Sequence, residues 1–320
     1  MSINFDQVIT KLKKAEFAKS PFKHIYLNNV FSENDFKKIT ECPEIKLRSV
    51  SNDEELFEQL FENGYKIIKF PGCIADKEYY IDWHNSNDRS KKKIINNEAC
   101  EGFGMTVRLI SPKSQILADL KGFIESELFL SVLAEKFDID LSECEADNGI
   151  QKYLDGYEIS PHPDIRRKAL TYMVNINSTP NSSILDHHTR YLRLKENYSY
   201  LSEFWKNNED VERAWVPWEW CDIDFQQTIN NSMVIFSPSH DTLHAVKADY
   251  DHLSGQRTQL YGNLWYKKVA YCRPSEWVEL DLVKGVGDAT SVLKKRDEDF
   301  RRLQRGSQDA GTTLSIKHRT

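Results

Sequence analysis

Two short stretches of the chain carry side chains whose types and spacing could bind a metal ion. His162-Pro163-Asp164 places an imidazole and a carboxylate two residues apart, and on a strand such residues point to the same face. His244, in Thr242-Leu243-His244, would add a second imidazole from another strand. Two histidines and one carboxylate hold one face of Fe(II) and leave the other face open for substrate chemistry.

Arg257 follows in the segment Gly255-Gln256-Arg257-Thr258. Its guanidinium is planar and always charged, so it can bind both oxygens of a carboxylate. If residues 247–256 form a loop, His244 and Arg257 fall on neighbouring strands. We therefore expect Arg257 beneath the metal, where it would bind a carboxylate cosubstrate.

The order of elements predicts helices first and strands later. Apolar residues recur at helical spacing before residue 148, whereas short strand-like runs follow it. This order indicates a β-sandwich or barrel braced by N-terminal helices. Helices are expected at 4–18, from Ser32 through Ile39, at 53–62, twice within 114–137 and near 199–208; later strands are expected at 149–154, 169–176, 189–194, 231–237, 243–248 and 257–266.

Two of these strands have one apolar face and one polar and aromatic face. The second kind of face suits the inside of a ligand-holding barrel, while the apolar face would pack on the core. The polar and aromatic faces comprise Thr171, Met173 and Asn175 on one strand and Arg257, Gln259, Tyr261, Asn263 and Trp265 on the other.

The composition excludes several classes of protein. Of 320 residues, 40% are hydrophobic and 29% are charged, which is typical of a globular protein, and a net charge of -6 argues against a nucleic-acid partner. The six cysteines form no CxxC pair, so neither a zinc ribbon nor a disulfide framework is expected. Without a signal-peptide pattern or a run of about 18 apolar residues, we expect a cytoplasmic protein with no membrane partner.

Three stretches, in order, resemble the prolyl 4-hydroxylase-like iron(II)- and 2-oxoglutarate-dependent oxygenases. Pro21–Ile25 with Val30-Phe31-Ser32 resembles the opening strand and helix of that family, residues 153–177 its metal-binding hairpin, and residues 231–266 its closing segment. The residues that carry the last two matches are Tyr153, Gly156, His162, Asp164 and Lys168, then Met233-Val234-Ile235-Phe236, His244, Gly255 and Arg257.

The resemblance implies an α+β, mainly β fold: a double-stranded β-helix (jelly-roll or cupin-like) barrel braced by N-terminal helices. It also implies an organisation along the chain. Residues 1–19 would form an N-terminal helix, and residues 20–272 a single oxygenase domain with helical support at 20–148 and a barrel core at 149–268. Residues 273–320 would be a C-terminal extension, disordered from about 306.

Carried over residue by residue, the resemblance makes His162, Asp164 and His244 the ligands of Fe(II). Arg257 would bind the distal carboxylate of 2-oxoglutarate, assisted by Thr171.

Two further residues are implied near the cosubstrate. Tyr153 would approach the cosubstrate or substrate from the preceding strand. Asn175 stands where the family often has an aromatic hydroxyl, so the hydrogen bonds to the cosubstrate would be arranged differently. The Asp186–Leu192 segment also departs from the family pattern, which makes the substrate side unusual.

The implied reaction consumes O2 and 2-oxoglutarate, releases succinate and CO2, and hydroxylates an unactivated C–H bond; ascorbate is a further reductant. Asp164 favours hydroxylation, because related halogenases have a small residue at that position. Long polar insertions at 71–103 and 178–228 could close over a small substrate. We therefore expect a small polar metabolite, such as an amino acid, a sugar or a biosynthetic intermediate.

Three other functions compete with this one. A hydroxylase of a protein or peptide side chain would need an open groove. A non-catalytic module that binds metal or 2-oxoglutarate would not need the complete triad together with Arg257, which is the set that generates an oxidant. A zinc hydrolase would need an extra carboxylate as general base, which is not evident in the sequence.

Several residues have alternative interpretations. His240 and His252 flank His244 and are rival ligands, but we expect both to face solvent. His187-His188 could form a second metal site, although a loop pair is favoured. Arg108 could bind a substrate carboxylate, but a salt bridge is the favoured role. Trp83, Trp218 and Trp220 are expected to be packing residues.

Overall fold

The computed structural model describes residues 3–86, 99–208, 211 and 214–267. Within them, the strands form two antiparallel sheets. The larger sheet consists of β1 (Ile25–Asn28), β2 (Tyr65–Ile67), β3 (Thr106–Leu109), β4 (Cys144–Tyr153), β6 (Lys168–Asn175), β9 (Ser232–Phe236) and β11 (Arg257–Tyr266). The smaller sheet consists of β5 (Glu158–His162), β7 (Thr189–Leu194), β8 (Cys221–Gln226) and β10 (His244–Lys247).

The chain alternates between the two sheets from β4 onward. The strand order is β1-β9-β6-β11-β4-β3-β2 in the larger sheet and β5-β10-β7-β8 in the smaller one. Every step from β4 to β11 therefore crosses from one sheet to the other, except the step from β7 to β8, which are paired neighbours. The described strands thus form two antiparallel sheets, in agreement with the expected mainly β fold, and these sheets do not close into one continuous barrel.

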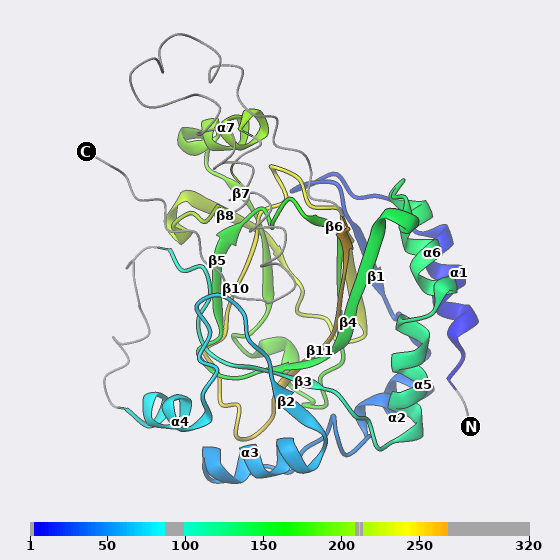
Figure 1. Ribbon diagram of the computed structural model, residues 1–320, viewed down its shortest axis with the longest axis vertical. Helices are drawn as coiled ribbons and strands as arrows, with labels where there is room; N and C mark the ends of the chain where they lie inside the picture. Colours follow the sequence, from blue (N-terminus) through cyan, green and yellow to red (C-terminus); the bar gives the residue numbers. More distant parts are fainter. Residues whose placement is uncertain (1–2, 87–98, 209–210, 212–213, 268–320) are drawn as a thin grey trace, which may run out of the picture.

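The helices of the described residues lie mainly in the first half of the chain, as predicted. Figure 1 shows α1, α5 and α6 along the outer side of the larger sheet, with α3 and α4 at the bottom of the view. The helices are α1 (Phe5–Lys14), α2 (Glu33–Thr40), α3 (Asp53–Glu62), α4 (Lys77–Asn85), α5 (Gln115–Ile124), α6 (Glu127–Lys136) and α7 (Tyr200–Asn207).

The two faces of the larger sheet differ as the sequence predicts. The outward residues Leu170, Val174, Leu260 and Leu264 are buried in one apolar core with residues of the covering helices. Ladder partners share a face, so the register Gln259↔Asn175 and Asn263↔Thr171 places the polar residues together on the opposite, inner face. Burial of the outer face therefore fixes the register that gathers polar groups between the sheets.

Local capping explains two helix starts in the support region. Ser32 accepts a hydrogen bond from the backbone of Asp35, and Asn52 accepts one from the backbone of Glu55. Both helices also carry acidic residues in their first turn, where the helix dipole favours negative charge.

Some elements differ from the prediction. Helix α4 lies within 71–103, which we expected to be an irregular loop, and Asp76 caps it. Its weak apolar periodicity explains why the pattern did not reveal it. Strand β8, which alternates few apolar residues, was not expected either, and β5 ends at His162, whereas the expected strand included Asp164.

Other expectations lie outside the described residues. These are the remainder of the insertion at 87–98 and the C-terminal extension at 273–320, together with the disorder expected from about 306. The five described cysteines are unpaired. In the part of the chain that the structure describes, none of the helices has the length and apolar character needed to span a bilayer.

Candidate functional site

His162, Asp164 and His244 come together on the smaller sheet. The ladder between β5 and β10 pairs His162 directly with His244, and their ring centroids lie 4.3 Å apart. The Nε2 atom of His244 lies 3.9 Å from the Asp164 carboxylate. Because the ligand atoms of all three residues lie within 4.8 Å of one another, one metal ion could contact them all.

Asp164 reaches this group in a way that the strand pattern did not predict. We expected His162 and Asp164 to share one strand face, but β5 ends at His162. Pro163 cannot donate to a ladder, and Asp164 adopts a left-handed backbone with φ of 74°. This conformation is uncommon for a residue other than glycine. The turn that it makes brings the carboxylate back towards the histidines.

Backbone hydrogen bonds set the tautomers of both histidines. Nδ1 of His162 lies 2.8 Å from the carbonyl oxygen of Ser160, and Nδ1 of His244 lies 2.9 Å from that of Thr242. A carbonyl oxygen can only accept, so each Nδ1 carries the proton and each Nε2 keeps a free lone pair. This is the arrangement of histidines that bind a metal through Nε2.

The charge states also suit a cation. Burial lowers the pKa of His162 to about 3 and also lowers that of His244, so both rings are neutral. Burial raises the pKa of Asp164, but Lys168 and the two imidazoles outweigh it and hold this pKa well below its usual range. The ammonium of Lys168 lies 2.7 Å from Asp164 Oδ1. The set therefore offers two neutral nitrogens and one anionic oxygen.

Arg257 lies between the sheets and is 2% exposed. Its Nη2 donates to Thr189 Oγ1 at 2.8 Å and to Gln259 Oε1 at 3.0 Å. Its Nη1 has no hydrogen-bond partner among the described residues. The expectation that His244 and Arg257 lie on neighbouring strands was wrong, because β10 and β11 belong to different sheets. Arg257 instead reaches across from the larger sheet to Thr189 of the smaller one.

Three other predicted residues lie on this inner face. Thr171 Oγ1 is 3.1 Å from Asp164 Oδ2, so it contacts the carboxylate, and no hydrogen bond joins it to Arg257. Asn175 accepts a hydrogen bond from Gln259, which holds Arg257. The guanidinium of Arg257 lies 4.5 Å above the ring of Tyr153. Thr171 thus contacts Asp164 of the triad, whereas Asn175 and Tyr153 lie around Arg257.

The sequence reasoning missed several partners of Arg257. Gln259 was on the predicted polar face, so its alternation with Arg257 could have indicated the contact. Thr189 and Tyr250 come from segments without such a signal. The Tyr250 hydroxyl accepts a hydrogen bond from the backbone of Arg257 at 2.9 Å and donates to the carbonyl of Tyr153.

The alternatives left open by the sequence can now be compared with the structure. His240 is partly exposed and lies outside the described groups that could hold a metal. Arg108 forms a salt bridge with Asp147 at 2.6 Å, in agreement with its favoured role. His187 and His188 do not lie in an exposed loop, because both are buried immediately before β7.

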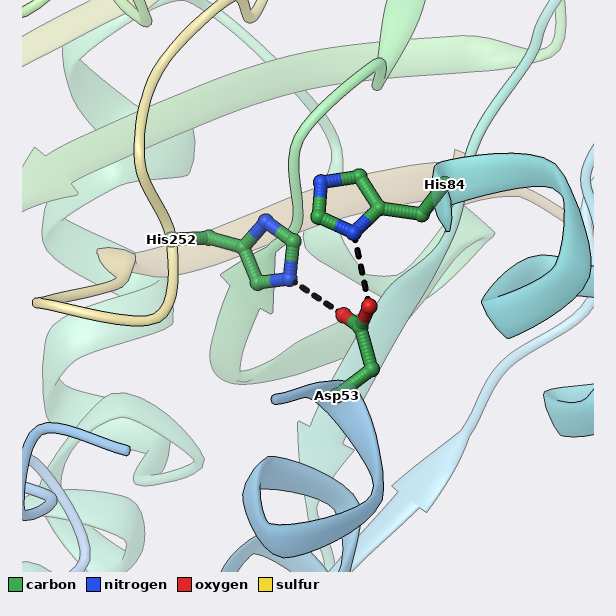
Figure 2. A group of neighbouring side chains, drawn as sticks. All are labelled: Asp53, His84 and His252. Carbon is green, nitrogen blue, oxygen red and sulfur yellow. Dashed lines mark hydrogen bonds and ion pairs between the residues drawn. The ribbon is translucent and has the colours of Figure 1, made fainter. Parts of the chain in front are cut away.

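A second group of one aspartate and two histidines is shown in Figure 2. The Asp53 carboxylate accepts hydrogen bonds from Nδ1 of His84 at 2.7 Å and from Nε2 of His252 at 2.8 Å. His252 is 0% exposed, so the expectation that it faces solvent was wrong. The ligand atoms of this group also lie within 4.8 Å of one another.

In this second group, the positions of the protons leave no nitrogen lone pair free to bind a metal. The backbone N–H of Asp155 donates to His252 Nδ1 at 3.3 Å, so the proton of that ring is on Nε2, which donates to Asp53. His84 lies between two carboxylates, 2.7 Å from Asp53 and 3.5 Å from Asp155. Its ring is therefore an imidazolium that already supplies the positive charge a metal would bring.

This network holds the segment that leads into Arg257. It joins the start of α3, the end of α4, the connection between β10 and β11, and the turn after β4. Asp155 also accepts a hydrogen bond from the backbone of Tyr250 at 3.1 Å, and Tyr250 holds the backbone of Arg257. The second group is thus structural, and only the first group has free nitrogen lone pairs.

Comparisons with known proteins give a fold-level finding. No protein-family model matches the chain, and no curated protein matches it. Matching solved structures include a prolyl hydroxylase from Trichoplax adhaerens in complex with a hypoxia inducible factor peptide (10% identity, 82% of this chain and 89% of that chain covered, TM-score 0.38). They also include a 2OG-Fe(II) oxygenase family oxidoreductase from Burkholderia pseudomallei (10% identity, 72% of this chain and 98% of that chain covered, TM-score 0.29).

A third match is HygX from Streptomyces hygroscopicus with nickel, 2-oxoglutarate and hygromycin B bound (8% identity, 82% of this chain and 87% of that chain covered, TM-score 0.33). The solved structures thus include members of the family that the sequence resembles. Since their identities and TM-scores are low, we argue function from the side chains themselves.

The tautomers predict one tight metal site per chain rather than two. Anaerobic Fe(II) titration followed by metal analysis should give one ion per chain. His162→Ala should abolish this binding, because it removes a free Nε2, whereas His84→Gln should retain it. A stoichiometry of two, or loss of the tight site in His84→Gln, would contradict the assignment.

The Asp53–His84–Asp155 network predicts a loss of stability at alkaline pH. Burial lowers the pKa of His84, but hydrogen bonds to Asp155 and Asp53 outweigh it and raise this pKa from 6.5 to about 9. The stabilisation is therefore complete below about pH 6.5 and is lost as the pH rises through about 9. Urea unfolding should show a decrease in the free energy of unfolding on the order of 2 kcal/mol over this window.

The same measurement on two variants isolates the contribution of His84. His84→Gln should lack this part of the pH dependence, since it carries no titrating charge. His240→Gln, a change at a partly exposed histidine on a turn, should keep it. Identical pH profiles for wild type and His84→Gln would show that His84 is not an imidazolium in the folded protein.

Proposed function

We propose that the chain is an Fe(II)- and 2-oxoglutarate-dependent dioxygenase that hydroxylates an unactivated C–H bond. The observation that carries the proposal is the presence of two features between the sheets: a triad that could bind a metal, and a buried guanidinium whose Nη1 has no partner among the described residues. In β7, Tyr191 is the ladder partner of His244, and Thr189, two residues earlier on the same face, contacts the guanidinium of Arg257, which supports their belonging to one site.

The triad fits Fe(II) in donor type and in protonation. His162 and His244 would each bind through Nε2, and Asp164 would bind through a carboxylate oxygen. Two histidines and one carboxylate are the ligand set of non-haem Fe(II) oxygenases, with open positions for cosubstrate and oxygen. When bound, the iron would supply the activation of O2 that oxidation of a C–H bond requires.

Arg257 fits the distal carboxylate of 2-oxoglutarate. A buried charge without a counter-charge is unfavourable, and no carboxylate is among the hydrogen-bond partners recorded for Arg257 within the described chain. Its Nη1 would donate to the cosubstrate, while Thr189 and Gln259 hold Nη2. Asn175 would act through Gln259, and Tyr153 would fix the plane of the guanidinium by stacking.

Two residues would tune the carboxylate that binds the metal. Lys168 contacts both oxygens of Asp164 and Thr171 contacts Oδ2, so together they would hold the orientation of the carboxylate towards the iron. This arrangement differs from the expectation that Thr171 assists Arg257. We propose that Thr171 instead acts on the metal side of the site.

The sheet topology supports a double-stranded β-helix. In this fold eight strands alternate between two four-stranded sheets, and the described strands β4 to β11 follow that alternation. The four pairs β4–β11, β5–β10, β6–β9 and β7–β8 are all antiparallel. The strands β1, β2 and β3 would then extend the larger sheet at its two edges.

We further propose that the substrate is a small polar molecule. The partly exposed residues of the inner face next to Asp164 are charged or aromatic, namely Lys168, Tyr261 and Trp265. The ammonium of Lys168 lies 5.4 Å from the ring of Trp265 and 5.9 Å from that of Tyr261. Such a surface favours polar groups with a flat or charged part over an aliphatic chain.

Anaerobic spectroscopy tests the assignment directly. Fe(II) and 2-oxoglutarate together should give a metal-to-ligand charge-transfer band that is lost in His162→Ala and kept in His240→Ala. With oxygen, the wild type should release succinate, and a panel of metabolites and peptides should identify the substrate class by its stimulation. If the wild type shows neither band nor succinate, the proposed function is wrong.

Arg257→Ala should raise the KM for 2-oxoglutarate by at least roughly 30-fold, because it removes one partner of a buried charged contact. Fe(II) affinity should remain nearly unchanged. Arg257→Lys should give a KM for 2-oxoglutarate between those of the wild type and Arg257→Ala, since an ammonium keeps the charge but cannot reproduce the planar fork of the guanidinium. Steady-state kinetics with parallel Fe(II) titration would make this comparison. An equal loss of Fe(II) and 2-oxoglutarate binding would mean that Arg257 is only structural.

A further inference from the structure

His187 and His188 are buried polar residues without a full set of partners. They are 1% and 3% exposed and immediately precede β7. Both ring nitrogens of His187, and Nε2 of His188, lack a hydrogen-bond partner among the described residues. Buried polar atoms are almost always paired, so three unpaired nitrogens on adjacent residues are available to hydrogen-bond a ligand.

The surroundings of this histidine pair contain Arg257. The ring of His187 packs edge-on against Tyr250, with centroids 4.7 Å apart, and the Tyr250 hydroxyl accepts the backbone N–H of Arg257. The positive charge of Arg257 also lowers the pKa of both histidines. The Nη1 of Arg257 is itself unpartnered among the described residues. The histidine pair is thus connected to Arg257 through Tyr250 and through Thr189, the residue that follows His188 and contacts the guanidinium at 2.8 Å.

The ligand that fits this region is an anion rather than a metal ion. Arg257 would repel a cation, and the described groups that could hold a metal do not include His187 or His188. Burial, the largest effect, lowers the pKa of His187 to about 2 and that of His188 to about 4, while a weaker backbone interaction with Ser182 acts in the opposite direction. Each ring is thus neutral and carries one N–H donor.

The charge in the region selects among anions. Arg257 contributes a single positive charge, and its neighbours Thr189, Gln259 and Asn175 are uncharged. One carboxylate would balance this charge, whereas a phosphate dianion would leave excess negative charge buried. A carboxylate also has enough lone pairs to accept from a guanidinium and two imidazoles together.

We propose that His187 and His188 bind, together with Arg257, the distal carboxylate of 2-oxoglutarate. The proposal rests on the proposed function, and it adds a specificity role for two residues. A 2-oxo acid without a distal carboxylate would leave the guanidinium and the imidazoles unpaired, and a site with unpaired buried polar groups rejects such a ligand strongly.

Equilibrium binding of two ligands to the Fe(II)-loaded full chain without oxygen tests this role. The ligands are 2-oxoglutarate and 2-oxopentanoate, which has a methyl group in place of the distal carboxylate. The double variant His187→Phe/His188→Phe keeps ring volume but removes both N–H donors. Calorimetry should show 2-oxoglutarate affinity reduced roughly 10- to 100-fold, with 2-oxopentanoate affinity nearly unchanged.

Two further variants serve as controls. His187→Gln/His188→Gln keeps an amide N–H at each position and should recover part of the lost affinity; it also carries the test if the phenylalanine variant does not fold. His240→Phe should bind both ligands as the wild type does. Fe(II) affinity should be the same in all variants, because none of them alters the triad.

Each contrary outcome has a distinct meaning. If the double variants bind 2-oxoglutarate as tightly as the wild type, or lose affinity for both ligands equally, the histidines do not contact the distal carboxylate. The proposed function survives either of these results. If the wild type itself binds no 2-oxoglutarate, the proposed function fails, and this inference fails with it.

Discussion

The burial of one guanidinium between two sheets is the constraint on which the site depends. Arg257 extends from the larger sheet, and its contacts come from elements far apart in the sequence: Thr189 in β7, Tyr153 in β4 and Tyr250 in the connection before β11. None of these groups is a carboxylate. The described residues thus fix the position of the charge without neutralising it, and the proposed carboxylate ligand would supply the counter-charge.

Two groups of one aspartate and two histidines have the same composition but differ in where their protons lie. In the group around Asp164, backbone carbonyls take the Nδ1 protons, so lone pairs face the carboxylate. In the group around Asp53, a backbone N–H faces His252 and a second carboxylate faces His84. The polarity of the backbone atom behind each ring therefore separates a ligand set from a structural ion network.

The sequence predicted what depends on local pattern. The faces of β6 and β11, the two consecutive helices α5 and α6, and the pairing of His162 with His244 all follow from alternation, periodicity and residue type. It did not predict what depends on distant partners. The burial of His252 requires Asp53, nearly two hundred positions earlier in the chain, and the left-handed turn at Asp164 overrides the strand pattern. Neither carries a local signal.

The ion pair between Lys168 and Asp164 bears on how the protein matures. The carboxylate already has a positive partner at 2.7 Å and a hydroxyl donor in Thr171, so its negative charge is compensated during folding. In small metal-dependent domains the ion itself drives the chain to fold, and a chelator unfolds them. Here the polypeptide itself supplies a counter-charge for Asp164, so its folding would not depend on a bound ion, and the proposed triad would take up its ion after the chain has folded.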